Sequence, residues 1–273
     1  MANSLNLNLS KSAKVRTARI LPLKLKDVSY EIEGMRLIKD LSVEFSSSSS
    51  LTILLGPNGA GKSLLLRLCH GLIEPSRGTV EWGGNENASA RRYQAMVFQR
   101  PVMLRRSVFA NLDHSLKHRG IKKAERIYKI EEILKHTGLT RLANVPARRL
   151  SVGEQQRLAV ARAWCLDPEV LFLDEPTAAL DPAATHSLEE IIDAIKKSGT
   201  KIIMSTHDLG QAKRLADEVL FLYRGRLLER ADANQFFDQP ENDLAQSFMR
   251  GELLWWNRQE LKPPEEFNNR KEI

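Results

Sequence analysis

A glycine-rich loop near residue 56 joins an apolar run to a segment with helical character. The run Leu51–Leu55 predicts a buried strand, and residues 64–68 are apolar enough to continue as a helix. The connecting loop is Gly56-Pro57-Asn58-Gly59-Ala60-Gly61-Lys62-Ser63. Its glycines allow backbone N–H groups to turn inward around a polyphosphate, beside the positive end of the helix dipole. A strand, this loop and a helix in that order predict a P-loop in an α/β fold.

The last two residues of the loop supply side chains for the same ligand. Lys62 would neutralise the β- and γ-phosphates, and the Ser63 hydroxyl would hold Mg²⁺. A glycine-rich turn without a ligand is the alternative interpretation, but it does not account for the Lys-Ser pair between strand and helix. The sequence therefore predicts a nucleoside triphosphate site.

The composition favours one domain in the cytosol. With 273 residues, 42% of them hydrophobic and 27% charged, the chain can bury one substantial core but is short for two. Cys69 and Cys165 lie in apolar helical contexts without metal-ligand spacing, which is typical of buried thiols in a reducing compartment. No apolar run approaches the roughly 18 residues that span a bilayer, and the start lacks the hydrophobic core of a secretory signal. We expect a chain that neither spans a membrane nor leaves the cytosol by itself.

Much of the net charge of +7 lies at the N-terminus. The basic residues that precede the first acid, Asp27, are Lys11, Lys14, Arg16, Arg19, Lys24 and Lys26. We interpret residues 1–20 as a flexible basic tail, and an organelle transit peptide is the alternative. Because the charge is local, it does not by itself indicate a nucleic-acid partner.

Residues 23–30 and 41–45 alternate between apolar and polar side chains, which predicts an antiparallel hairpin. The serines 46–50 follow as a low-complexity loop. Residues 100–164 have helical spacing and are predicted to form a helical subdomain.

Two continuous apolar runs predict central strands of a parallel sheet. They are residues 170–173 and Lys201–Thr206. The helix between them begins with Asp181 as its N-cap and Pro182 in its first turn. A strand, a helix and a strand form a parallel crossover, and residues 218–229 predict a closing hairpin.

These segments define the predicted domain organisation. One domain occupies residues 21–235, and residues 236–273 are a short polar tail with an apolar island at 253–256.

Two acids follow the first of these strands directly. Asp174 would reach Mg²⁺, directly or through water, and Glu175 would polarise the attacking water. Open parallel sheets bind their ligands at this edge. Helix-capping acids in a turn are the alternative interpretation, and the P-loop upstream favours the catalytic one.

The segment from Leu150 to Arg157 resembles the signature of ATP-binding cassette (ABC) ATPases. The order of P-loop, Gln99, signature, Asp-Glu pair and His207 is that of the family, and the resemblance runs from about residue 23 to 229. It implies a P-loop NTPase with a RecA-like parallel sheet core, an N-terminal antiparallel β subdomain and a helical insert. It also implies hydrolysis of ATP with Mg²⁺.

The resemblance implies a homodimer. Ser151 and the backbone around Gly153 open a helix over residues 154–166, so that a hydroxyl, N–H groups and the helix dipole can receive a γ-phosphate. In the family, that phosphate belongs to ATP held by the P-loop of a second copy. Asp181 is implied to couple the two sites while it caps its own helix.

Three further residues take roles from the resemblance. Tyr30 would stack on adenine, Gln99 would sense Mg²⁺ and the attacking water, and His207 would contact the γ-phosphate. The alternatives are a strand tyrosine without a ligand, an isolated glutamine without a role and a structural histidine.

Two residues depart from the Leu-Ser-Gly-Gly-Gln pattern of the family, namely Val152 and Glu154. If the backbone at residue 152 needs a positive φ, valine would cost about 1–2 kcal/mol there. Glu154 also brings a carboxylate close to a phosphate. We expect a competent but slower ATPase. The serines 46–50 replace a glycine-bearing turn, and nothing in the sequence explains them.

The resemblance also implies a membrane partner, because such an ATPase has no permeation path of its own. Residues 100–112 follow Gln99 and mix apolar with basic side chains. They are implied to line a groove for a cytoplasmic helix of a transmembrane permease, and an ordinary solvated helix face is the alternative. The protein would then lie peripherally at the cytoplasmic face of the inner membrane.

A single cassette without a fused membrane segment looks like a bacterial importer subunit, with a periplasmic or extracellular substrate-binding protein as an indirect partner. Residues 161–184, together with residues 251–255, resemble the ATP-binding subunits of tungstate uptake systems, and less closely those for phosphate and molybdate. A soluble ABC ATPase of translation, DNA repair or iron–sulfur assembly is the alternative.

Three features argue against that alternative, and no nucleic acid is expected. There is no second cassette, no long heptad insertion and no basic stripe interleaved with aromatic residues. An ATP-gated scaffold without catalysis is disfavoured by Asp174 and Glu175.

Overall fold

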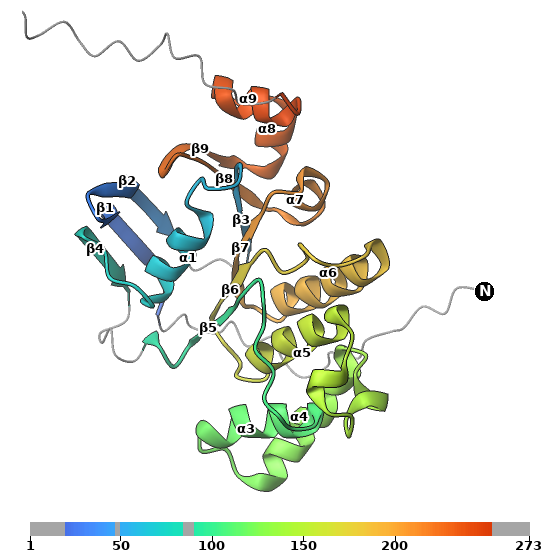
Figure 1. The fold of residues 1–273 in the computed structure, drawn as a ribbon. Coiled ribbons are helices and arrows are strands. Elements are labelled where there is room, and N and C mark those ends of the chain that lie inside the picture. The colour runs from blue at the N-terminus through green and yellow to red at the C-terminus, as the bar shows by residue number, and fades with distance from the viewer. Residues whose placement is uncertain (1–19, 47–49, 84–89, 253–273) are drawn as a thin grey trace, which may run out of the picture.

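The computed structural model describes residues 20–46, 50–83 and 90–252. Its centre is a six-stranded sheet in the order β5-β6-β7-β3-β8-β9 (Figure 1). The strands are β3 (Leu51–Leu55), β5 (Gln94–Val97), β6 (Val170–Asp174), β7 (Lys201–Thr206), β8 (Glu218–Tyr223) and β9 (Arg226–Asp232). The first five in this order are parallel, and β9 runs antiparallel to β8. The P-loop NTPase fold predicted from the sequence is confirmed.

The sheet is covered on both faces, which explains why its central strands are apolar throughout. Every residue of β3, β6 and β7 is buried. Ile53, Leu171 and Met204 point into the core that contains α5 (Val152–Trp164) and α6 (Pro182–Lys197). Alternate residues of the same strands point into the opposite core, with α1 (Lys62–His70). Because successive strand residues face opposite sides, one apolar run fills both cores.

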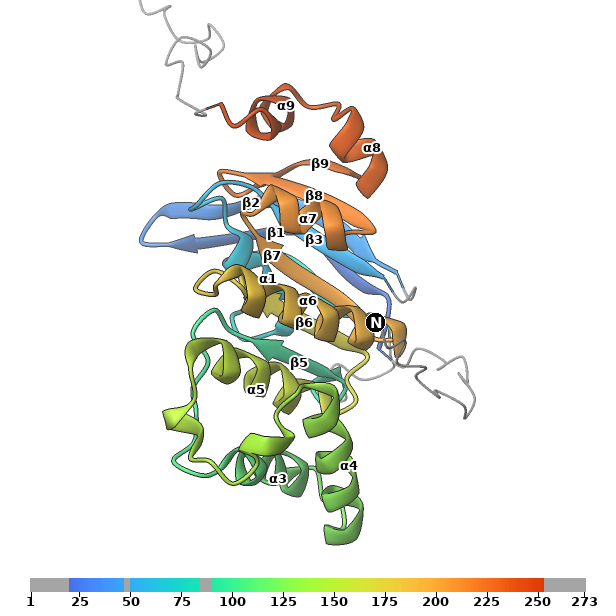
Figure 2. The same ribbon diagram turned by 90° about the vertical axis from the view of Figure 1, so that its right-hand side faces the viewer.

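A second, antiparallel sheet in the order β2-β1-β4 packs against α1 (Figure 1). The helices α5 and α6 cover the other face of the six-stranded sheet, which is turned toward the viewer in Figure 2. The strands of the antiparallel sheet are β1 (Leu23–Ile32), β2 (Met35–Phe45) and β4 (Arg77–Trp82). The predicted hairpin is therefore present, and its second strand begins at Met35 rather than residue 41. Glu33 and Gly34 both have positive φ, as a tight turn between two strands requires.

The region predicted to be helical contains α3 (Val108–His118), α4 (Lys123–His136), the short helices η1 (Thr140–Leu142) and η2 (Ala147–Arg149), and α5. Residues 100–106 are not helical. The helix α7 (Leu209–Leu215) follows β7 and completes the layer that contains α6. Among the described residues, no helix is both long and apolar enough to cross a bilayer.

The chain after β9 differs from the predicted polar tail. It forms α8 (Ala233–Asp238) and α9 (Asp243–Met249). Phe236 is fully buried, and its ring lies 6.2 Å from that of Phe221, while the ring of Phe248 lies 5.4 Å from Phe221. Polar residues separate these aromatic residues in the sequence, so the segment is polar on average. The prediction of a polar tail from composition therefore missed its apolar face. Of the predicted N-terminal tail, residues 1–19 lie outside the described residues, as does the apolar island at 253–256, whereas Ile20 is fully buried and so does not belong to a tail.

One buried charge makes stability depend on pH. Lys201 in β7 is 2% exposed, and its Nζ donates to Thr52 Oγ1 at 2.7 Å. Burial lowers its pKa from 10.5 to about 8, and Glu218 opposes this effect. The unfolded state therefore binds more protons between about pH 8 and pH 10.5, so stability rises with pH in that window.

We predict that Lys201→Met removes this dependence. Between pH 8 and 10.5 the wild type should gain up to about 3 kcal/mol of unfolding free energy relative to the variant. Urea unfolding at several pH values measures the difference. Lys197→Met, which changes an exposed lysine of α6, should keep the wild-type profile. A difference between Lys201→Met and the wild type that stays constant with pH would contradict the argument.

Candidate nucleotide-binding and catalytic site

The P-loop connects β3 to α1, and at two of its positions the backbone tolerates only glycine. Gly56 and Gly61 have φ of 147° and 104°. A Cβ at Gly56 would overlap the Leu222 carbonyl oxygen, and a Cβ at Gly61 would lie 2.8 Å from Ile38 Cδ1. Gly61 is the N-cap of α1 and makes no side-chain cap. The first N–H groups of α1 therefore receive no capping side chain, which is the arrangement that suits an anion.

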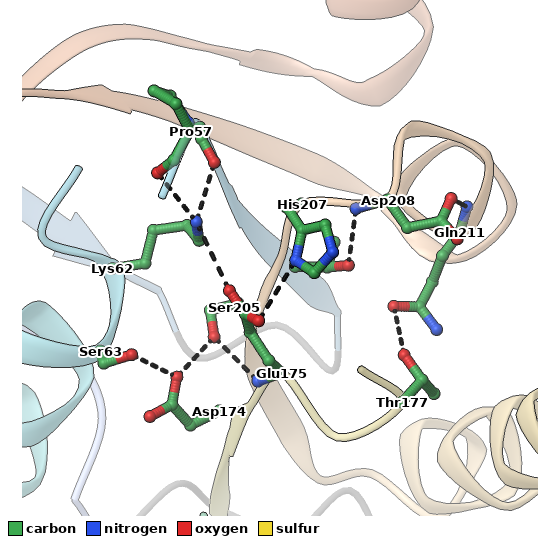
Figure 3. A network of polar contacts seen from close by, with 12 residues as sticks. Pro57, Lys62, Ser63, Asp174, Glu175, Thr177, Ser205, His207, Asp208 and Gln211 are labelled. Carbon is green, nitrogen blue, oxygen red and sulfur yellow. Dashed lines mark hydrogen bonds and ion pairs between the residues drawn. The ribbon is translucent and has the colours of Figure 1, made fainter. Parts of the chain in front are cut away.

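Lys62 lies across the loop. Its Nζ donates to the carbonyl oxygens of Gly56 at 2.8 Å and Pro57 at 3.2 Å, and lies 3.6 Å from Glu175 Oε1 (Figure 3). Lys62 is 5% exposed, and burial lowers its pKa while Glu175 and Asp174 oppose this effect. Of the remaining loop residues, Asn58 and Gly59 are exposed and Ala60 is buried.

Asp174 is held by two hydroxyl groups at the end of β6. Ser63 Oγ donates to Asp174 Oδ1 at 2.7 Å, and Ser205 Oγ donates to the same oxygen at 2.8 Å. Asp174 is 4% exposed. A carboxylate beside a hydroxyl is a set of hard oxygen donors, and such a set fits Mg²⁺.

Glu175 occupies the centre of the site. Its carboxylate lies between Lys62 and His207, whose Nδ1 is 3.2 Å from Glu175 Oε2. Its φ is 43°, an unusual value for a residue with a side chain. The Glu175 N–H donates to Ser205 Oγ at 3.0 Å. Such a backbone costs about 1–3 kcal/mol and persists only where its surroundings fix it.

Ser205 is the residue of this site to which the sequence analysis gave no role. It bonds the side chain of Asp174 and the backbone of Glu175, and so links both acids to β7. The available signal was a serine directly after the apolar run of residues 202–204, two positions before His207.

Gln99 is exposed and follows β5 by two residues. Val97 pairs with Leu173, so Gln99 lies at the same edge of the sheet as Asp174, one strand away. Within the described ranges, no hydrogen bond joins Gln99 to the acids. Tyr30 is partly buried on β1 and pairs with Ile38 in the antiparallel sheet, whose core it contacts.

The signature serine is the N-cap of α5. Ser151 Oγ accepts from the Glu154 N–H at 3.3 Å, and Glu154 Oε2 accepts from the Ser151 N–H at 2.8 Å and from its hydroxyl at 2.9 Å. This capping box starts the helix at Val152, not at the predicted residue 154. Val152 is 60% exposed and is not among the described residues with positive φ. The expected loop strain is therefore wrong, and Val152 gives no reason for a slower ATPase.

Ser151, Gly153 and Asp181 form a second group. They line one cavity of about 390 Å³ between the N-termini of α5 and α6. Asp181 Oδ1 accepts from the Ala184 N–H at 2.8 Å, as predicted for an N-cap. A Cβ at Gly153 would lie 3.0 Å from the Ala184 Cβ, so glycine allows the two helices to approach. No P-loop residue lines this cavity.

A P-loop after β3, with a buried aspartate and a glutamate at the end of β6, defines the class of protein, a P-loop NTPase. Comparisons with known proteins narrow it. A family model described as ABC transporter matches residues 38–178. The tungstate uptake system ATP-binding protein TupC of Peptoclostridium acidaminophilum is 41% identical over 205 residues, covering 75% of this chain and 94% of that relative.

Further relatives agree. A phosphate import ATP-binding protein, PstB of Mycoplasmoides gallisepticum, is 35% identical and covers 82% of this chain and 74% of its own. The solved structure of cbiO1 from Clostridium perfringens, part of the ABC transporter complex cbiONQ, superimposes with a TM-score of 0.72 at 27% identity, covering 80% and 91%. The chain belongs to the ABC transporter ATP-binding family, and it is an ATP-hydrolysing enzyme.

We predict that Ser205→Ala lowers kcat for ATP hydrolysis about tenfold to a hundredfold. Hydrogen bonds to charged groups contribute about 1.5–3 kcal/mol, and this serine also fixes the Glu175 backbone. Steady-state turnover of the purified chain measures the effect. Ser198→Ala, at the end of α6, is the control and should turn over like the wild type. Unchanged turnover of Ser205→Ala would show that the hydrogen bonds of Ser205 to Asp174 and Glu175 do not contribute to ATP hydrolysis.

Proposed function

We propose that the chain is the ATP-hydrolysing subunit of an ABC importer that takes up tungstate, acting as a homodimer with a transmembrane permease. The observation that supports tungstate as the cargo is the 41% identity to TupC over 94% of that relative. Phosphate is the second candidate, because PstB proteins are 33–35% identical to this chain. Both cargoes are tetrahedral oxyanions.

In this proposal the P-loop, from Gly56 through Pro57, Asn58, Gly59, Ala60, Gly61 and Lys62 to Ser63, binds the phosphates of ATP. The uncapped N-terminus of α1 offers N–H groups to them. Lys62 Nζ exchanges its two loop carbonyls for phosphate oxygens, which stabilise a buried ammonium better. Tyr30 stacks on the adenine ring.

The same exchange prepares Glu175 for catalysis. Its carboxylate now pairs with Lys62 and lies next to His207. A γ-phosphate attracts the Lys62 ammonium and accepts a hydrogen bond from His207, so it releases the carboxylate from both. Glu175 then accepts a hydrogen bond from the attacking water and orients it toward the γ-phosphorus.

Ser63, Asp174 and Gln99 are the residues proposed to hold Mg²⁺. The hydroxyl of Ser63 and the carboxylate of Asp174 are already adjacent at 2.7 Å. Bound Mg²⁺ would supply positive charge to the β- and γ-phosphates. Ser205 keeps the Asp174 carboxylate oriented toward this position.

The second copy completes the site. Ser151, Gly153 and Asp181 line a cavity that excludes the P-loop of their own chain. We therefore assign them to the γ-phosphate held by the partner, so that two ATP molecules lie between two copies. Closed two-fold symmetry makes the contact reciprocal.

The segment between β5 and α3 is the proposed permease contact. Phe98 is 42% exposed and Val102 is 74% exposed, and Arg100, Arg105 and Arg106 are exposed beside them. Exposed apolar side chains within a basic surface favour a partner protein over solvent. This contact places the chain peripherally at the cytoplasmic face of the inner membrane, with the substrate-binding protein on the opposite side.

Glu154 is predicted to weaken closure of the pair. Its carboxylate bonds Ser151, which the proposal assigns to the partner's γ-phosphate. Glu154→Gln preserves the capping box but removes the charge. The ATP concentration for half-maximal hydrolysis should fall about fivefold, because like charges about 4 Å apart in water cost about 1 kcal/mol.

Turnover measured against ATP concentration tests this effect. The matched control is Glu125→Gln, which removes an acid from the first turn of α4. If both variants follow the wild-type curve, Glu154 does not oppose closure.

Uptake by the reconstituted complex tests the cargo. Vesicles that hold this chain with its permease and binding protein should accumulate tungstate when ATP is supplied on the side of the ATPase. A tenfold excess of phosphate should leave most of the tungstate uptake intact, and Glu175→Gln should abolish it. Uptake of phosphate without tungstate would select the second candidate. Uptake of neither oxyanion would refute the proposed cargo class.

A further inference from the structure

A chain of hydrogen bonds, buried at its centre, joins three elements behind the proposed catalytic residues. Thr177 Oγ1 donates to Gln211 Oε1 at 3.1 Å, and Gln211 Nε2 donates to Glu189 Oε1 at 3.2 Å. Arg214 donates to both carboxylate oxygens of Glu189, at 2.7 and 3.0 Å. We call Thr177, Gln211, Glu189 and Arg214 the strut. It links the turn after β6 to α7 and α6.

The strut has a defined direction. The carboxylate of Glu189 only accepts hydrogen bonds, so the amide nitrogen of Gln211 must face it. The amide oxygen is then left for the Thr177 hydroxyl. Gln211 is fully buried and Glu189 is 6% exposed, so water does not replace either bond without cost. Arg214 supplies a positive charge that pairs with this buried carboxylate.

Two residues of the strut lie close in sequence to the proposed catalytic residues. Thr177 comes two residues after Glu175, and Gln211 comes four residues after His207. Asp208 connects His207 to the helix, because its Oδ1 accepts from the Gln211 N–H at 2.9 Å (Figure 3). The strut therefore joins the two segments that carry the Glu175 and His207 side chains.

The two segments that the strut joins lie beside an open cavity. It has a volume of about 520 Å³, and Glu175, Thr177, Glu189, His207 and Arg214 all line it. Ser205 fixes the backbone N–H of Glu175, but among the described residues no hydrogen bond joins the turn after Glu175 to β7. Since the Glu175 φ of 43° needs support from its surroundings, the Thr177 end of the strut supplies that support on the downstream side.

We propose that Gln211 is a positioning residue for ATP hydrolysis, which acts through Thr177 to hold Glu175 against His207. The inference rests on the catalytic roles proposed for Glu175 and His207. The strut does not touch the P-loop, so it sets the rate of the chemical step and not the affinity for ATP.

The test compares kcat and KM of the full-length chain. Gln211→Met keeps the length of the side chain but removes both hydrogen bonds, and Thr177→Val removes the hydroxyl. Each should lower kcat about tenfold, because small misplacements of catalytic groups are costly. KM for ATP should stay within about twofold of the wild type. Thr177→Ser should restore kcat, because it restores the hydroxyl.

The double variant shows whether Thr177 and Gln211 act through the same connection or affect turnover independently. Thr177→Val with Gln211→Met should turn over no more slowly than either single variant, since both break one connection. The matched control is Gln246→Met in α9, which removes a hydrogen bond from the Gln246 side chain to the Pro240 carbonyl oxygen. It should leave kcat unchanged.

Several outcomes would overturn the inference. These are kcat values within twofold of the wild type, a loss in KM instead of kcat, fully multiplicative effects, or failure of Thr177→Ser to recover. If Gln211→Met does not fold, the Thr177→Val and Thr177→Ser pair decides the question. A wild-type chain that does not hydrolyse ATP would instead refute the proposed function.

Discussion

The buried ammonium of Lys62 is the charge around which the site is organised. It lies where the loop after β3 meets the acids at the end of β6, in contact with two backbone carbonyls and close to the carboxylates of Glu175 and Asp174. A buried ammonium needs such partners, because desolvation favours its neutral form. Glu175, the proposed catalytic base, is one of them. In the proposed mechanism, binding of phosphate and preparation of the catalytic base are therefore the same event.

The parallel sheet makes this meeting possible. The strands β3, β6 and β7 are neighbours, and their carboxyl ends bring together segments more than a hundred residues apart in the sequence. Ser151, Gly153 and Asp181 lie elsewhere, at the N-termini of α5 and α6, where Gly153 allows the two helices to approach closely. If both groups of residues serve one ATP, as proposed, the site needs two copies to be complete, and the proposal then gives a physical reason for dimerisation that depends on ATP.

The features that could be predicted from the sequence are local ones. The P-loop, the strand that ends in Asp174 and the helix that begins after Asp181 each depend on neighbouring residues, and each is present. The start of α5 also depends on a local signal, since Ser151 and Glu154 have the spacing of a capping box. The family pattern, which has glycine at residue 152, suggested a strained loop there instead.

The remaining features could not be predicted because they depend on contacts between distant segments. Ser205 meets Asp174 across 31 positions, and Thr177 meets Gln211 across 34. No periodicity reports such pairs. The helices α8 and α9 are stabilised by the rings of Phe236 and Phe248 on Phe221, which only the folded arrangement brings together. Exposed Gln99 at the sheet edge remains a prediction from the family resemblance.

The central claim is that the P-loop of one copy and Ser151 of the other enclose the same ATP. The most direct measurement is the molar mass of the full-length Glu175→Gln variant by light scattering with saturating ATP and Mg²⁺. The account predicts a dimer with two bound ATP molecules, and its loss when Ser151→Glu is added, because a second carboxylate would meet the phosphate. A variant that binds ATP fully yet remains a monomer, also when its permease is present, would contradict the account.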